Sequence, residues 1–104
     1  MHPEAQAELD DLPDREATAV LNAITKLREL GPDLPFPHSS NVASADNLRE
    51  LRPRAGRSPW RAFYRPLGDV FVIAAVGPEA QHKPKGFIRA VEAAEGRLIE
   101  LEED

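Results

Sequence analysis

Three arginines, Arg57, Arg61 and Arg65, lie in a segment (residues 57–76, RSPWRAFYRPLGDVFVIAAV) that otherwise has the character of a central β-strand pair. Alternate residues of a strand project from the same face about 7 Å apart, close to the phosphate spacing of an extended RNA strand. Guanidinium groups bind phosphate in a bidentate manner and stay charged at any working pH. The pattern predicts a sheet surface on which Arg61 and Arg65 clamp a phosphate backbone and stabilise charge on a phosphodiester.

The distribution of charge along the chain supports this hypothesis, although the net charge of the whole chain does not. The formal net charge is -5, which by itself argues against a nucleic-acid binder. Residues 41–89, however, hold nine basic and four acidic side chains, a net of +5, against -10 for the rest of the chain. The field that steers a polyanion is local, so the basic middle predicts a binding face. The alternative is that these arginines only form a solvated face of the protein.

Length and composition limit the class of protein. The chain of 104 residues has the size of one domain, so we expect residues 1–104 to form a single domain. It has no cysteine, which excludes disulfides and thiolate metal sites and favours a cytoplasmic location. The first residues do not resemble a signal peptide, and the longest apolar stretch, Val70 to Val76, is too short to span a bilayer. We therefore expect a cytoplasmic protein without membrane contact.

Helical periodicity appears in three segments. Residues 3–12 and 14–30 carry apolar side chains at spacings of three and four, separated by Pro13 and a capping Asp14. The second segment stops at Gly31-Pro32, a common C-terminal signal. The last helix is predicted from Pro84 toward Leu101, because proline is tolerated in the first turn.

Strands are predicted over residues 48–54, 59–67 and 69–76, after a loop over 32–47 that is rich in Pro, Ser and Asn. His38 lies in this loop without a visible partner, and we interpret it as an ordinary loop residue. Short turns between the strands indicate an antiparallel meander. The order of elements predicts an α+β fold of two layers, in which an N-terminal helical hairpin and a C-terminal helix pack on one face of a small sheet.

Strand alternation then sorts the side chains of residues 59–67 onto two faces. One face is expected to carry Trp60, Ala62 and Tyr64, and the other Arg61, Phe63 and Arg65. We expect Tyr64 to pack or hydrogen-bond in the core. Phe63 has the character of a core residue between sheet and helix, but if Arg61 shares the open face Phe63 does too, and it is then a stacking platform for a base. The parity leaves the opposite arrangement open, in which Phe63 is buried and the clamp does not form.

Four segments in this order carry a family resemblance: HPEAQAELDDLP, LRELRPRAGRSPWRAFYR, DVFVIAAVGPEAQHKP and the helix after Pro84. Together they resemble the RelE/HigB/ParE superfamily of toxins from type II toxin-antitoxin systems, in particular its phage-derived, HigB-like branch. The resemblance covers nearly the whole chain and implies a RelE-like fold. It also implies an activity: members resembling RelE cut messenger RNA in the ribosomal A site without a metal, whereas members resembling ParE inhibit DNA gyrase.

The resemblance implies roles for individual residues. Arg61 matches the strand arginine that stabilises the transition state, and Arg52 matches a basic position on the preceding strand. The segment QHKP matches an exit loop that carries a basic group, which makes His82 or Lys83 the candidate proton-transfer residue. Among side chains, histidine has an unperturbed pKa near neutrality, which favours His82. The other expected RNA-binding residues are Arg54, Arg57, Arg65 and Lys85. No metal or cofactor is expected.

The partners implied by the resemblance are a cognate antitoxin, with which an oligomer is expected, and the ribosome with its messenger RNA. Three functions remain open: a ribosome-dependent endoribonuclease, a ParE-like gyrase inhibitor, and a catalytically weak protein that only binds its antitoxin. Two features differ from the family pattern. Relatives usually have a short strand before the HPEA segment, so either this strand is missing or the true start lies upstream, and the last helix has no tyrosine.

Overall fold

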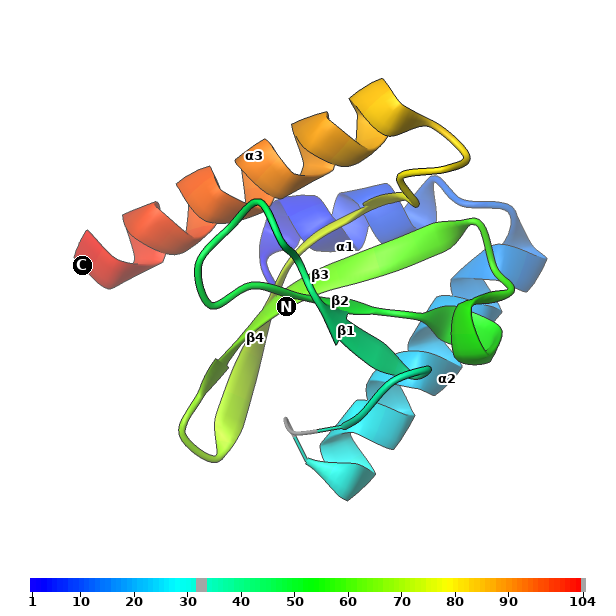
Figure 1. Cartoon of the computed structure of the whole chain (residues 1–104), viewed down its shortest axis with the longest axis horizontal. Coiled ribbons are helices and arrows are strands. Elements are labelled where there is room, and N and C mark those ends of the chain that lie inside the picture. The colour runs from blue at the N-terminus through cyan, green and yellow to red at the C-terminus, as the bar shows by residue number, and fades with distance from the viewer. Residues whose placement is uncertain (32–33, 104) are drawn as a thin grey trace.

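The computed structural model describes residues 1–31 and 34–103 and has an α+β fold with three helices and one antiparallel sheet of four strands (Figure 1). The helices are α1 (Pro3–Asp10), α2 (Asp14–Leu30) and α3 (Pro84–Glu103). The strands are β1 (Ser39–Asn41), β2 (Arg49–Leu51), β3 (Trp60–Leu67) and β4 (Val70–Pro78), with a short 3-10 turn η1 (Pro53–Gly56) between β2 and β3. The predicted helices and the α+β fold class are confirmed.

The sheet has the order β1-β2-β3-β4, so neighbouring strands in sequence are neighbours in space. The long β3–β4 hairpin closes at Gly68, whose positive φ of 63° suits the tight turn. Strand β2 pairs with β3 only from Arg49↔Tyr64 to Leu51↔Ala62. Pro66 of β3 therefore lies beyond β2, where proline does not interrupt the β2–β3 ladder.

Strand β1 lies inside the segment that the sequence predicted as a loop. Its three residues, Ser39, Ser40 and Asn41, pair antiparallel with β2. Small polar residues give no hydrophobic alternation, so the pattern of residues 32–47 did not indicate a strand. Pro32 and Asp33 of that predicted loop lie outside the described residues.

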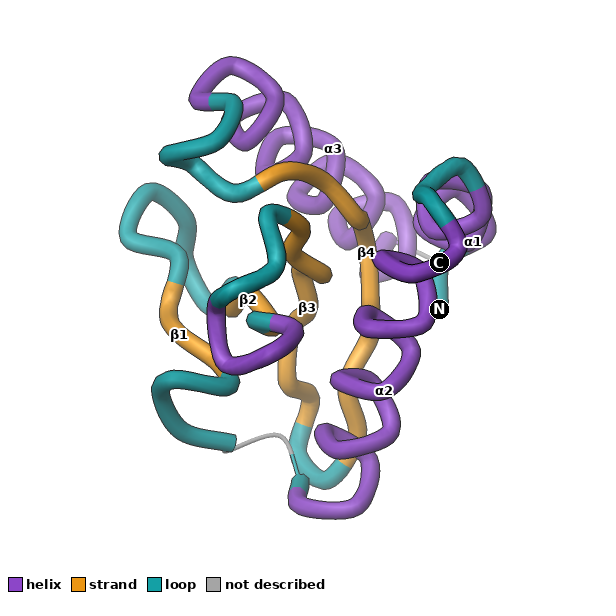
Figure 2. Tube along the Cα trace, turned by 90° about the vertical axis from the view of Figure 1, so that its right-hand side faces the viewer, coloured by secondary structure: helices purple, strands orange, loops and turns teal. Residues whose placement is uncertain are grey.

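Helices cover both faces of the sheet, which contradicts the expectation of an open face. Figure 2 shows the strands in their order across the view, with α1 and α2 beside β4 and α3 above the sheet. The buried apolar side chains form two separate clusters, one on each face. The prediction that all helices pack on one face is therefore wrong.

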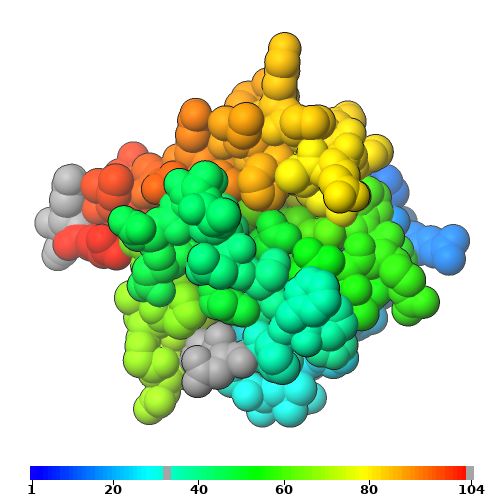
Figure 3. All heavy atoms as spheres, in the orientation of Figure 1, coloured from blue at the N-terminus to red at the C-terminus, as the bar shows by residue number. Residues whose placement is uncertain are grey.

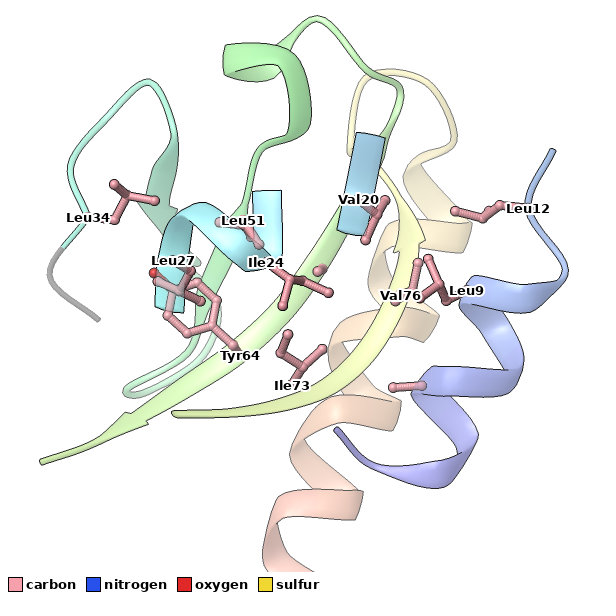
Figure 4. Packing of buried hydrophobic residues seen from close by; sticks show 12 residues of the cluster. Leu9, Leu12, Val20, Ile24, Leu27, Leu34, Leu51, Tyr64, Ile73 and Val76 are labelled. Atoms are coloured by element: carbon pink, nitrogen blue, oxygen red, sulfur yellow. The ribbon is translucent and has the colours of Figure 1, made fainter. Parts of the chain in front are cut away.

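The first cluster joins α1 and α2 to the sheet (Figure 4). Leu27 and Ile24 of α2 pack toward Tyr64 and Ile73, and Leu9 of α1 packs toward Val76. Tyr64 is fully buried, and its hydroxyl lies 2.6 Å from Ser39 Oγ, as the predicted core role requires. This hydrogen bond ties β1 to the centre of the sheet.

The second cluster joins α3 to the other face. Phe63 is fully buried there and packs edge-on against Phe87 of α3, with ring centroids 5.5 Å apart. Gly77 lets the helix approach the sheet, because a Cβ at this position would lie 2.5 Å from the Ala90 Cβ. Phe63 is therefore a core residue and not a platform for a base, as the alternative parity predicted.

Within the described residues, no helix is both long enough and apolar enough to cross a membrane.

Candidate nucleic-acid interface

Arg61 points into the α3 face of the sheet and is almost fully buried, with 2% of its side chain exposed. Its Nη2 donates to Glu79 Oε2 at 2.7 Å, and its Nη1 donates to the carbonyl oxygens of Ser58 (2.7 Å) and Trp60 (2.9 Å). Its Nε lies 3.5 Å from Glu50 Oε1 and is a buried nitrogen without a hydrogen bond. The guanidinium is thus held between two carboxylates.

This environment shifts the pKa of the Arg61 guanidinium. Burial is the main influence and lowers the pKa of its guanidinium below the ordinary value, while Glu50 acts in the opposite direction. Arg52 lowers the pKa of Arg61 further, and Glu79 raises it. Because both carboxylates already pair with Arg61, the prediction that it lies open to clamp a phosphate is wrong.

Arg65 lies at the other end of β3 and does not join Arg61. In the β2–β3 register, Arg49 lies opposite Tyr64 and Leu51 lies opposite Ala62. Arg65 therefore lies past one end of β2, and Arg61 lies past the other end. The Arg65 side chain donates to the backbone carbonyls of Asn47 (2.9 Å) and Asp46 (3.1 Å) and pairs with Glu102 of α3 at 2.9 Å. It fastens a loop and a helix end, so the two-arginine clamp is absent.

Arg52 connects the buried pair to the surface. Its Nη1 donates to Glu50 Oε1 at 3.2 Å, the same oxygen that faces Arg61, and its Nε donates to the Pro37 carbonyl at 3.0 Å. The guanidinium also lies 4.9 Å from the centre of the Phe36 ring. Arg52 therefore has a fixed position at the η1 end of the sheet.

The turn η1 gives the next two arginines their positions through an unusual backbone. Arg54 and Ala55 both have positive φ angles (55° and 56°), a region that residues with a side chain rarely adopt. Arg54 is held there by Glu16 of α2, with Nη1 to Oε1 at 2.9 Å. Gly56 follows at φ 93°, and a Cβ there would lie 2.5 Å from Arg52 Nη2. Such strain is found where local geometry serves a site.

A basic groove of about 610 Å³ lies between α2 and the β2–η1 segment. Its floor contains apolar side chains, among them Ala19, Ala23 and Leu51. Its cationic lining residues are Arg15, Lys26, Arg52, Arg54 and Arg57, and His38 adds an imidazole. No carboxylate lines the groove in the described part of the chain. Two of these cations, Arg52 and Arg54, are ion-paired with Glu50 and Glu16, whereas Arg15, Lys26 and Arg57 have no ion pair among the described residues and can attract a polyanion.

The predicted proton-transfer residues lie in the loop between β4 and α3. His82 is exposed, and its ring packs edge-on against Trp60 with the centroids 6.5 Å apart. Trp60 directly precedes Arg61, so His82 lies at the same end of the sheet as the basic groove. Lys83 and Lys85 are also exposed there, at the start of α3. In Figure 3 this yellow loop lies above the green β2–β3 region.

The structure thus divides the predicted site residues. Arg52, Arg54 and Arg57 come together in the groove, and Arg61 and Arg65 are engaged in internal ion pairs. His82 and Lys83 lie in the loop before α3, and Lys85 lies in the first turn of α3; none of the three lines the groove. Arg15 and Lys26 were missed, although their spacing of eleven residues with Asn22 between them places all three on one helix face. In the described residues, no three His, Cys, Asp or Glu side chains converge as a metal site would require.

The chain matches the model of a known family. Residues 7–77 match the family described as Phage derived protein Gp49-like (DUF891), which covers more than half of the chain and runs from α1 to the end of the β3–β4 hairpin. A search of curated proteins finds no significant relative. The matched segment includes the groove, the η1 turn, and Arg61 and Arg65 of β3. The chain therefore belongs to the Gp49-like family of phage-derived proteins, a toxin-like family related to RelE.

Proposed function

We propose that this protein is the toxin of a type II toxin-antitoxin system and that it cuts messenger RNA on the ribosome without a metal, as members resembling RelE do. The observation that carries the proposal is the groove, whose lining among the described residues has no carboxylate and holds two ion-paired arginines and three cations without an ion pair, Arg15, Lys26 and Arg57. Phosphate contacts supply most of the affinity of a protein for RNA, and arginine is the side chain best suited to them. The toxin-like family supports the same assignment.

In this proposal the RNA backbone binds in the groove and continues past Arg52 to the loop of His82 and Lys83. The 2′-hydroxyl attacks the adjacent phosphorus, and the bond from phosphorus to the 5′-oxygen breaks. His82 accepts the 2′-hydroxyl proton, and Lys83 donates a proton to the leaving 5′-oxygen. The products are a 2′,3′-cyclic phosphate and a 5′-hydroxyl. Arg61 is a positioning residue, since it orients Glu50 and Glu79 and through Glu50 the guanidinium of Arg52.

A reconstituted translation reaction with 5′-end mapping of the messenger tests this function. We expect the wild-type protein to leave cuts within codons of ribosome-bound messenger, and His82→Ala to lose them. Gln81→Ala is the matched control, because it changes an exposed neighbour in the same loop that carries no proton-transfer group. Intact messenger with the wild-type protein, together with inhibited DNA gyrase, would show a ParE-like toxin instead.

One observation favours a second candidate, a protein that binds its cognate antitoxin and cleaves poorly. The strand arginine implied by the resemblance is neutralised by Glu50 and Glu79 and is not free to contact a scissile phosphate. In that case the translation reaction proceeds normally with the wild-type protein, and gyrase activity is unchanged.

A further inference from the structure

One aromatic side chain beside the groove is exposed to an unusual extent. Phe36 is 68% exposed, the highest fraction among the large hydrophobic residues of the described chain. It lies between Leu34 and His38, which both line the groove. Figure 3 shows this part of the chain, in turquoise, at the molecular surface next to the green β2–β3 region. Its position therefore places an aromatic ring at the rim of a cationic groove.

The ring is supported on one face and open on the other. Arg52 covers one face, with its guanidinium carbon 4.9 Å from the ring centre, a distance typical of a cation–π contact. Arg52 is itself fixed by hydrogen bonds to the Pro37 carbonyl (3.0 Å) and to Glu50 (3.2 Å). Because Arg52 covers one face, the exposed fraction of Phe36 belongs mainly to the other face, so the ring presents an open planar surface to solvent.

We propose that Phe36 is a stacking platform for one base of a single-stranded RNA whose phosphates bind in the groove. This inference rests on the proposed action on RNA and adds a specific contact to it. Bases of single-stranded RNA stack on aromatic side chains, while nearby cations bind the backbone. The neighbours of Phe36 favour RNA over an apolar protein surface, because Arg52 and His38 adjoin it and Leu34 is buried.

Fluorescence anisotropy with a 5′-labelled, unstructured ten-nucleotide RNA tests the platform. We expect Phe36→Ala to raise the dissociation constant by about 5- to 150-fold, the range for loss of one stacked base. The slope of affinity against salt concentration should stay unchanged, because no phosphate contact is lost. Phe36→Leu keeps an apolar side chain over Arg52 but removes the ring, so it should weaken binding as alanine does.

Phe36→Trp should bind as tightly as the wild type, and its added tryptophan fluorescence should be quenched by the RNA beyond any quenching of Trp60. Ile88→Ala is the matched control, an exposed apolar residue on α3 that should leave affinity unchanged. Wild-type binding that Phe36→Ala and Phe36→Leu both retain would overturn the platform and leave the proposed function intact. A wild-type protein without measurable RNA affinity would overturn the platform, whereas the proposed function fails only if the translation reaction leaves the messenger intact. Loss of affinity in Phe36→Trp without quenching would also overturn the platform.

Discussion

Arg61 and Glu79 form a buried ion pair across the β3–β4 hairpin, with Nη2 and Oε2 2.7 Å apart. Arg61 is the second residue of β3 and lies opposite Gly77 near the open end of the hairpin, and Glu79 follows directly after the last residue of β4. The pair therefore closes the open end of the hairpin, and Glu50 adds a carboxylate from β2 at 3.5 Å. A side chain that the sequence suggested for phosphate contact instead holds three parts of the fold together.

Replacing Arg61 with alanine should destabilise the protein. The change leaves Glu50 and Glu79 without their shared cation and two carbonyl oxygens without a donor. Loss of one partner of a buried ion pair typically costs about 3 to 5 kcal/mol, and the 26% exposure of Glu79 favours about 3 kcal/mol here. Urea unfolding measures this free energy.

Arg57→Ala is the control for that measurement. Arg57 is exposed, and its side chain donates only to the Arg54 carbonyl within the described residues. We expect its free energy of unfolding to stay within about 0.5 kcal/mol of wild type. Equal stability of Arg61→Ala and Arg57→Ala would contradict the structural role of Arg61.

Lys26 and Arg28 should affect RNA binding differently although they lie two residues apart on α2. Lys26 lines the basic groove, whereas Arg28 lines a separate cavity with Asp69 and Met1. Lys26→Gln should reduce the slope of log affinity against log salt by about 0.7, the value for one phosphate of a single strand. Arg28→Gln should leave the slope unchanged. Titration of a labelled RNA at several salt concentrations gives both slopes, and identical slopes for the two variants would remove Lys26 from the interface.

The helices and the β3–β4 hairpin could be predicted because their signals are local. Apolar spacing of three and four residues defines α2 and α3, and Gly68 marks the hairpin turn. The sequence also indicated a central strand pair over residues 57–76. Of the two strands, β3 is central, whereas β4 is an edge strand of the sheet with a hydrophobic cluster on each side.

The environment of Arg61 and the groove could not be predicted in the same way. Strand parity separates Arg61 from Tyr64 but does not say which face is open, since α3 can pack on either one. The partner Glu79 lies eighteen residues away, and its approach depends on the register of the hairpin. The groove forms only where α2 and η1 meet in space, so its cations are scattered between residues 15 and 57 of the sequence.

Tyr64→Phe should loosen β1 more than the rest of the sheet. The Tyr64 hydroxyl lies 2.6 Å from Ser39 Oγ and accepts from Arg49 Nε at 3.3 Å, so it connects all three strands on this side of the sheet. A buried hydrogen bond of this kind contributes about 1 kcal/mol. Amide hydrogen exchange should show faster exchange at Ser40 and its β2 partners than in the β3–β4 hairpin. Uniform protection in the variant would show that β1 is held by other contacts.

Gly56→Ala should weaken RNA binding, whereas Gly31→Ala should not. Both glycines have φ near +92°, so alanine at either position costs about 1–3 kcal/mol of backbone strain. At Gly56 the new Cβ would also lie 2.5 Å from Arg52 Nη2, whereas at Gly31 no described atom lies within 4 Å. The Arg52 guanidinium must then move and lose its fixed place between Phe36 and Glu50. Urea unfolding should show similar losses for the two variants, and RNA titration should show weaker binding only for Gly56→Ala. Equal RNA affinity of the two variants would mean that the fixed position of Arg52 does not matter for RNA binding.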